Sequence, residues 1–265
     1  MSVSNLDGNR PNAGRIYDYL LGGHHNFEAD RLAADRLVQI FPFVPKAARL
    51  QRWCLGDLAE ELARRGFDLI IDFASGLPTQ DHLHQNVPPA STIIYSDYDP
   101  VTVEYGREIL KDVPNVHIFQ ADAGAPESLL ELPEVEKVLQ GRRDVGLVMW
   151  GVSSFLTDDQ MRHTMRYLYD WAGPQSCLVF QAQGADADPT DPANIQVGEL
   201  YKKMGTTTYS RTLAEYVKLL QPWHPDATGW VSLLDWHGLD QSIMTQEDIR
   251  NCGPGGIGYG AYLVK

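Results

Sequence analysis

The sequence predicts an α/β fold, in which helices precede and then alternate with the strands of a mostly parallel sheet. Short apolar runs alternate with helical segments between residues 69 and 180, which is typical of βαβ units. No run of this kind occurs before residue 68, where apolar residues instead recur at helical spacing. Three of the runs end in an acid, at Asp72, Asp97 and Asp122, so they repeat every 25 residues. This interval suits one strand and one helix.

The first quarter of the chain is expected to be helical after a mobile tail over residues 1–14. Gly22 and Gly23 stop the first helix, Asn26 is the candidate N-cap of the second, and Pro45 suits the first turn of the third. The three predicted helices span residues 15–21, 27–41 and 45–65.

The remaining elements follow from the alternation of apolar runs and helical spacing. We predict five strands over residues 69–71, 92–95, 116–119, 145–149 and 177–180, with helices over 100–110, 126–139 and 158–171 between them. The Asp- and Pro-rich stretch 184–195 reads as a loop. Two more helices, near 192–204 and 211–220, and a late pair of strands, at 230–236 and 257–264 around a turn at 253–256, complete the prediction.

Composition narrows the class of protein. The 265 residues suit one elaborated domain or a domain with a cap. A net charge of −13, from 22 basic and 35 acidic residues, argues against nucleic acid or an anionic membrane as partner. No run of 18 apolar residues and no apolar signal core are present. Three dispersed cysteines without a CxxC pair favour free or buried thiols and a cytoplasmic location.

The three acids should meet at one ligand site, because the carboxyl ends of parallel strands share an edge of the sheet. The loop Asp72-Phe-Ala-Ser-Gly76 has one glycine and is a poor cradle for pyrophosphate, whereas Asp72 suits an ammonium group. Asp97 can accept hydrogen bonds from a ribose diol, and Asp122 can accept one from an exocyclic amine. A ligand with these groups and no phosphate is S-adenosylmethionine, so we predict it as the cofactor.

Several motifs resemble a family abundant in actinobacteria, that of S-adenosylmethionine-dependent methyltransferases long labelled a domain of unknown function. The matching stretches are Arg15-Ile-Tyr-Asp-Tyr-Leu-Leu-Gly-Gly23, Asn26-Phe27, Ala29-Asp30-Arg31, Gly76-Leu-Pro-Thr79 with His84, Tyr95-Ser-Asp-Tyr-Asp-Pro100 and Ala121-Asp122. The resemblance implies a seven-stranded, mostly parallel Rossmann-like methyltransferase sheet with helices on both faces and an N-terminal helical cap. Residues 1–66 would form the tail and cap, and residues 67–265 the Rossmann-like domain, with substrate-side insertions after residue 184.

The resemblance also implies roles for individual residues at the cofactor. The loop after Asp72, with Ala74, Ser75 and Gly76, would pack on the methionine part, Asp97 would hold the ribose, and Asp122 with Ala123 would meet the adenine. We further expect Tyr98, Asp99 and Trp150 beside the cofactor. Arg15 and Tyr17 should line the cleft from the cap, and Arg15 could pair with the methionine carboxylate.

The sequence says less about the acceptor and the catalytic groups than about the cofactor. We expect a small-molecule acceptor on the C-terminal side, over a floor of Gly151 and Ser153, with Trp223, Trp230 and Trp236 as walls unless they serve the core. His237 and His24 are the candidate general bases. His82 and His84, two residues apart on a helix, would point apart, so we predict a hydrogen-bonding role for them and no metal site.

The sequence also leaves alternatives to a methyltransferase. The family's first loop usually reads Asp-Ile-Gly-Thr-Gly, and Trp150-Gly-Val-Ser-Ser-Phe155 lacks a histidine expected there. These departures leave room for a regulatory protein that binds S-adenosylmethionine without transferring a methyl group. The missing glycines disfavour a nicotinamide-dependent oxidoreductase, and the missing second glycine after Ser153 disfavours a serine hydrolase. The oligomeric state is not determined by the sequence.

Overall fold

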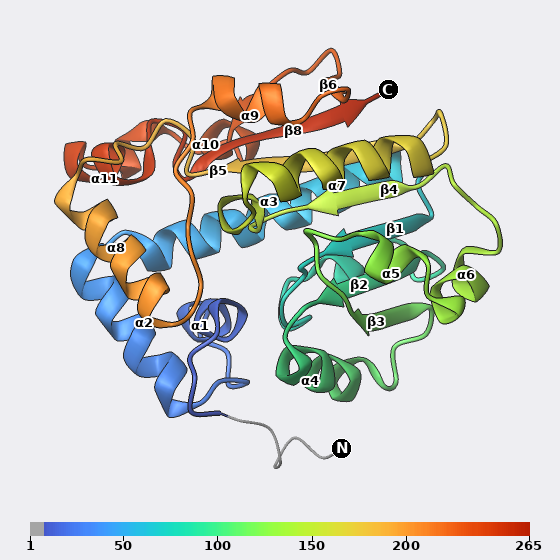
Figure 1. Cartoon of the computed structure of the whole chain (residues 1–265), viewed down its shortest axis with the longest axis horizontal. Helices are drawn as coiled ribbons and strands as arrows, with labels where there is room; N and C mark the ends of the chain where they lie inside the picture. Colours follow the sequence, from blue (N-terminus) through green and yellow to red (C-terminus); the bar gives the residue numbers. More distant parts are fainter. Residues whose placement is uncertain (1–7) are drawn as a thin grey trace.

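Eight strands form one mostly parallel sheet in the computed structural model, which describes residues 8–265 (Figure 1). Their order is β3-β2-β1-β4-β5-β8-β6, and β7 pairs with β8 off this path. The strands are β1 (Leu69–Phe73), β2 (Thr92–Asp97), β3 (Val116–Gln120), β4 (Gly146–Met149), β5 (Cys177–Gln183), β6 (His224–Pro225), β7 (Val231–Ser232) and β8 (Gly258–Val264). Strand β8 is antiparallel to both β5 and β6, so β6 runs in the same direction as β1–β5.

The helices confirm the predicted alternation. They are α1 (Ala13–Leu20), α2 (Glu28–Ile40), α3 (Val44–Arg64), α4 (Pro100–Leu110), α5 (Glu127–Leu130), α6 (Pro133–Leu139), α7 (Asp158–Trp171), α8 (Pro192–Lys203), α9 (Leu213–Leu219), α10 (Leu233–Trp236) and α11 (Gln246–Cys252), with 3₁₀ turns at Leu83–Gln85, Ser153–Phe155 and Gln241–Ile243. None of these helices is both long enough and apolar enough to span a bilayer, within the described residues.

Some predicted boundaries were wrong. The helix expected over 126–139 is two helices, because Pro133 has no N–H to donate and begins a new helix, α6. The strand expected over 230–236 ends at Ser232, whose hydroxyl accepts the Asp235 N–H and caps α10. The N-cap of α2 is Phe27 rather than Asn26, and Asp30 accepts its N–H at 2.8 Å. The expected mobile tail lies partly in residues 1–7, outside the described residues.

Helices cover both faces of the sheet, as predicted. Successive residues of β1 point to opposite faces: Ile71 belongs to one core with α5–α7 and α9, and Ile70 to another core with α3, α4 and α10. Both neighbours are fully buried, which explains why the strand reads as a continuous apolar run. The three cysteines, which are free, are also buried.

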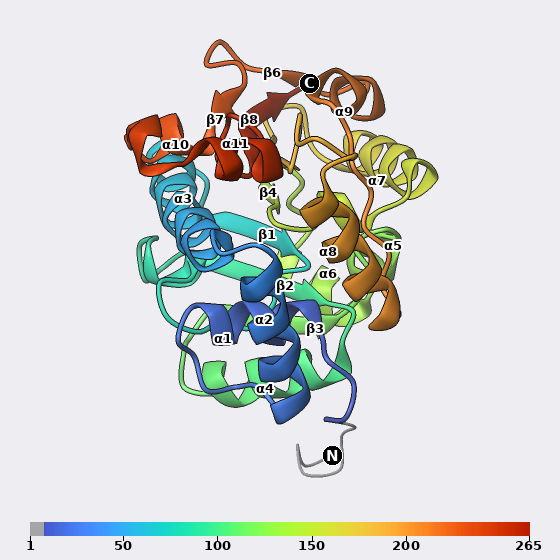
Figure 2. The same ribbon diagram turned by 90° about the vertical axis from the view of Figure 1, so that its left-hand side faces the viewer.

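The cap lies at the carboxyl ends of the parallel strands, and Figure 1 shows the arrowheads of β1 and β4 pointing toward it. Ile16 of α1 and Leu37 of α2 form a third apolar core, against which Val197 and Tyr201 of α8 pack. Figures 1 and 2 both show α8 beside α2. Helix α3 packs on the sheet instead. The division of the chain at residue 66 therefore stays a prediction, since α3 joins the cap to the sheet.

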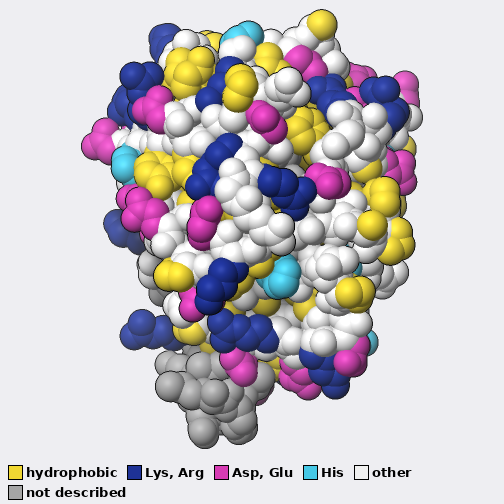
Figure 3. All heavy atoms as spheres, turned by 90° about the vertical axis from the view of Figure 1, so that its right-hand side faces the viewer, with side chains coloured by type: hydrophobic (Ala, Val, Ile, Leu, Met, Phe, Trp, Pro, Cys, Tyr) yellow, Lys and Arg dark blue, Asp and Glu magenta, His cyan; other side chains and the backbone are white. Residues whose placement is uncertain are grey.

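The molecular surface far from the cap carries charges of both signs. Figure 3 shows Lys and Arg side chains interspersed with Asp and Glu on this face, rather than gathered into one basic patch.

Candidate functional site

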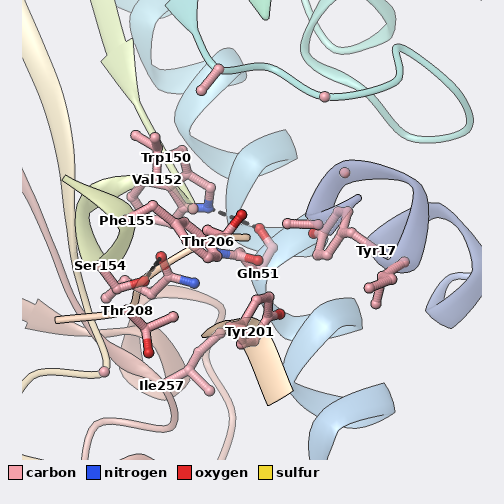
Figure 4. A pocket seen from close by; sticks show the side chains of 18 of the residues that line it. Tyr17, Gln51, Trp150, Val152, Ser154, Phe155, Tyr201, Thr206, Thr208 and Ile257 are labelled. Carbon is pink, nitrogen blue, oxygen red and sulfur yellow. Dashed lines mark hydrogen bonds between the residues drawn. The ribbon is translucent and has the colours of Figure 1, made fainter. Parts of the chain in front are cut away.

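One cavity of about 660 Å³ lies between the carboxyl ends of β1–β5 and the helices of the cap. Figure 4 shows side chains from α1, α3, the end of β4 and the segment after α8 around it. Of the predicted site residues, those that line the cavity are Tyr17, Asp72, Ala74, Ser75, Gly76, Asp97, Tyr98, Asp122, Ala123, Trp150 and Gly151. The structure therefore brings together the end of every one of the first four strands.

The three acids at the strand ends have different surroundings. Asp72 is 2% exposed, its carboxyl makes no hydrogen bond with any described residue, and burial raises its pKa well above the usual value. Asp97 accepts the N–H of Asp99 at 2.9 Å and that of Gly76 at 3.1 Å. Burial raises the pKa of Asp97 to about 6. Asp122 is exposed at the cavity rim and accepts the Gly124 N–H at 2.8 Å.

The loop after β1 turns sharply toward the cavity. Ala74 and Gly76 have φ of 55° and 67°, in the left-handed region that favours glycine. The buried His82 supports this loop, because its Nε2 donates to the Ser75 carbonyl at 3.1 Å while its Nδ1 meets the Tyr95 hydroxyl at 2.9 Å. Burial lowers the pKa of His82 well below its usual value, so the ring is neutral. His84 also bonds Tyr95, at 3.0 Å, so both histidines have the hydrogen-bonding role expected of them.

Arg52 of α3 is a cavity residue that our sequence interpretation missed. Arg52 is 5% exposed, and its guanidinium lies over the ring of Tyr17, 5.2 Å from the centroid. One nitrogen reaches the Gln80 carbonyl at 3.5 Å, and Nε has no partner among the described residues. A signal was available: Arg52 interrupts the apolar stripe of α3, four residues after Ala48 and three before Leu55.

Arg15 does not line the cavity, contrary to our expectation. It is 2% exposed, and its guanidinium donates to Asp30 at 2.8 Å, to Asp99 at 2.7 Å and to the Arg10 carbonyl at 2.6 Å. Asp99 in turn caps α4 and lies outside the cavity lining. These two residues tie the cap to the sheet edge, because their charges satisfy one another.

The end of β4 is fixed by carboxamides. Gln181 Oε1 accepts both the Gly151 N–H at 2.9 Å and Gln51 Nε2 at 2.7 Å. The indole of Trp150 donates to the Gln51 carbonyl at 3.0 Å, as Figure 4 shows. Ser153 is fully buried and donates to the Gln181 carbonyl at 2.7 Å, so it braces the strand end instead of lining the cavity. Its neighbour Ser154 lines the cavity in its place.

The predicted histidine bases lie outside the cavity lining. His237 stacks on Trp53 with ring centroids 5.1 Å apart, and its Nδ1 lies 2.7 Å from Asp57 Oδ2, where α10 packs on α3. His24 is exposed in the connection between α1 and α2.

The three tryptophans expected as walls also lie outside the cavity lining. Trp223 is 1% exposed and donates to the Met165 carbonyl at 2.9 Å. Trp230 packs edge-on against Phe180 in the core. Trp236 stacks on Tyr262 at 4.9 Å and touches the back of Trp150. Trp223 is buried in the core, and Trp230 and Trp236 are half-buried against it, in line with core packing, which was the other interpretation of these residues.

The C-terminal third reaches the cavity through different residues. Helix α8 contributes Val197 and Tyr201, and the segment after it contributes residues 205–210. Asn251 and Ile257, before β8, line the same end. These residues have no distinctive sequence spacing, so only the tertiary fold identifies them.

The chain is similar to known proteins both in sequence and in fold. The sequence model of the S-adenosyl methyltransferase family matches residues 1–259. A proposed methyltransferase from Thermobifida fusca shares 28% identity, with 98% of this chain and 96% of that chain covered and a TM-score of 0.81. A DUF574 family protein from Streptomyces avermitilis shares 26% identity, with 98% and 99% covered and a TM-score of 0.82. No curated protein matches the sequence.

Proposed function

Because the chain belongs to the S-adenosyl methyltransferase family and is therefore an S-adenosylmethionine-dependent methyltransferase, we propose that its cavity holds this cofactor beside a small-molecule acceptor. The cofactor would lie along the ends of β1–β3, and the acceptor would lie toward β4, β5 and α8. When bound, the sulfonium supplies a methyl group that is already activated, so the protein has mainly to position the reactants and exclude water.

The observation that carries the assignment of the cofactor half is a buried arginine and a buried acid whose side chains both keep polar atoms without a partner among the described residues. Arg52 Nε has no partner, the Asp72 carboxyl has no hydrogen bond among the described residues, and the two groups are close enough to affect each other's charge. A free amino acid carries one carboxylate and one ammonium. We therefore assign Arg52 to the methionine carboxylate and Asp72 to the ammonium, in place of the earlier assignment of Arg15.

The nucleoside half of the cofactor would use the next two strand ends. Asp97 keeps free lone pairs on both carboxyl oxygens after accepting two backbone N–H groups, so it can accept from a ribose diol. Asp122 and Ala123 line the cavity beyond it, with Tyr98, and would meet the adenine. The left-handed turn at Gly76 allows the backbone to approach the ligand closely.

A small acceptor suits the space that remains. Ligand cavities typically measure about 300–1,000 Å³, and about 660 Å³ shared between two molecules leaves room for a compact acceptor. The net charge of −13 disfavours nucleic acid as acceptor. The free cysteines and the acidic composition fit a cytoplasmic enzyme.

Calorimetric titration with S-adenosylmethionine tests this proposal, with Asp97→Ala as the variant. Loss of hydrogen bonds to a charged group costs ~1.5–3 kcal/mol, so the affinity should fall about ten- to hundredfold. Asp112→Ala, which removes an exposed acid outside the cavity lining, is the control and should bind like the parent. Unchanged affinity in Asp97→Ala, or no binding by the parent protein, would contradict the assignment.

A further inference from the structure

The charged residues that line the cavity are confined to one part of it. Among the described residues they are Arg52, Asp72, Asp97 and Asp122, which lie at the ends of β1–β3 or face them from α3. The part near β4, β5 and α8 is lined by neutral side chains only, within the described chain. A carboxylate or phosphate placed there would lose its hydration without gaining a protein cation, so this part disfavours an anionic acceptor.

One polar group in this neutral part lacks a partner. Asn251 is 4% exposed and lines the cavity, and its Oδ1 makes no hydrogen bond within the described residues. A buried carbonyl without a donor is costly, so a bound N–H or O–H group would relieve it. Six residues further along the chain, Ile257 lines the cavity with φ at 81°, a conformation that is rare for a β-branched residue. Local strain of this kind clusters at ligand sites.

Four aromatic side chains contribute to the walls. Tyr17, Trp150, Phe155 and Tyr201 surround the same space in Figure 4. The polar atoms of Tyr17 and Trp150 are already used, because they donate to the carbonyls of Ala48 and Gln51. These rings therefore offer faces and edges to a planar ligand, and aromatic faces also attract a cation.

The same lining bears on the atom that is methylated. His24 and His237 lie outside the lining, and burial raises the pKa of Tyr201 to about 12, so this tyrosine stays protonated. A phenol or an ammonium group must lose a proton to become nucleophilic, whereas a pyridine-type ring nitrogen already offers a lone pair at neutral pH. The neutral part of the cavity thus suits an acceptor that needs no protein base.

On the basis of the proposed function, we propose that the acceptor is an uncharged nitrogen heteroaromatic whose N–H donor binds Asn251 and whose ring nitrogen takes the methyl group. The ring-nitrogen lone pair forms the bond to the methyl carbon, and the carbon–sulfur bond breaks with its electron pair left on sulfur. The positive charge moves from sulfur to the ring nitrogen, among the aromatic faces, and no proton is released.

Matched probes test this inference. With the protein saturated with S-adenosylhomocysteine, calorimetry compares nicotinamide, which is uncharged, with nicotinate, its carboxylate counterpart. Nicotinamide should bind at least about tenfold more tightly, which corresponds to 1.4 kcal/mol. With S-adenosylmethionine, nicotinamide should be methylated without proton release, as followed with a pH indicator, and 3-hydroxybenzamide, which needs a base, should not be methylated.

Two variants at one position separate recognition from folding. Asn251→Leu should weaken nicotinamide binding about tenfold, and Asn251→Gln, which keeps an uncharged carboxamide oxygen as acceptor, should retain most of it. Both should bind S-adenosylhomocysteine like the parent, which also reports that they fold.

Three results would overturn the inference while leaving the proposed function intact: tighter binding of nicotinate, no binding of nicotinamide at millimolar concentration, or turnover of 3-hydroxybenzamide with proton release. Failure of the parent protein to bind S-adenosylhomocysteine would instead refute the proposed function.

Discussion

The pairing of Arg52 with the methionine carboxylate predicts a specific loss in Arg52→Met. Arg52 is 5% exposed, and its Nε has no partner among the described residues. Removal of a hydrogen-bonded charge facing a ligand anion costs about 1.5–3 kcal/mol, so S-adenosylhomocysteine should bind about ten- to hundredfold more weakly. Methionine keeps an aliphatic stem that can pack on Tyr17, so the change tests the charge more than the packing.

The control ligand is 5′-methylthioadenosine, which keeps the nucleoside and the sulfur but lacks both charged groups of the amino acid. Its affinity, measured by the same calorimetric titration, should stay within about twofold in Arg52→Met. Arg49→Met, on an exposed position of the same helix, should leave both ligands unaffected. An equal loss for the two ligands would show that Arg52 only supports the structure, and no loss for either would refute its assignment to the carboxylate.

Three further predictions concern stability and pH. Arg15→Ala leaves the fully buried Asp30 without its cation, so urea denaturation should show a loss of about 3–5 kcal/mol, and a loss below 1 kcal/mol would refute the buried ion pair. Burial raises the pKa of Asp97 to about 6 and that of Asp72 as well, and a protonated carboxyl accepts hydrogen bonds poorly. S-adenosylhomocysteine affinity should therefore fall as pH drops from 7 to 5, and calorimetry on Asp97→Asn should show a shallower pH dependence. Trp223→Ala should destabilise the fold by about 3–5 kcal/mol with little change in S-adenosylhomocysteine affinity, whereas a selective loss of ligand binding would return this residue to the cavity.

Most strands and helices could be predicted from the sequence, because the local residue pattern of each element agrees with the way it packs in the fold. Strands buried on both faces must be apolar throughout, so β1 and β2 are visible as short runs. Helices α4 and α7 have the predicted bounds, and Asp99 and Thr157 accept N–H groups of their first turns, so the local caps agree with the fold. The strand expected near Trp236 failed because the Ser232 side chain caps a helix there, and apolar composition alone does not distinguish the two.

The tryptophans show that a sequence predicts that a residue is buried but does not predict what covers it. A large indole in a C-terminal segment must be buried, but burial against a ligand and burial against the core have the same signature in a sequence. Trp223 packs against Tyr169 and Trp236 stacks on Tyr262, and each partner lies more than twenty residues away along the chain. Cavity residues such as Tyr201 and Asn251 became visible only after α8 and the segment before β8 were placed over the strand ends.

Arg15 and Arg52 show that the sequence also does not predict which charged side chain is already paired within the protein. Arg15 stands in the most distinctive motif of the chain, and so it was the natural candidate for a ligand anion. Two other matching stretches supply Asp30 and Asp99, however, so the charge of Arg15 is already matched within the protein. Asp99 also donates its N–H to Asp97, the proposed ribose acceptor. The motif therefore fixes the cap against the cofactor edge through Arg15 and Asp99. The cavity arginine is instead Arg52 of α3, which is buried and whose Nε has no partner among the described residues.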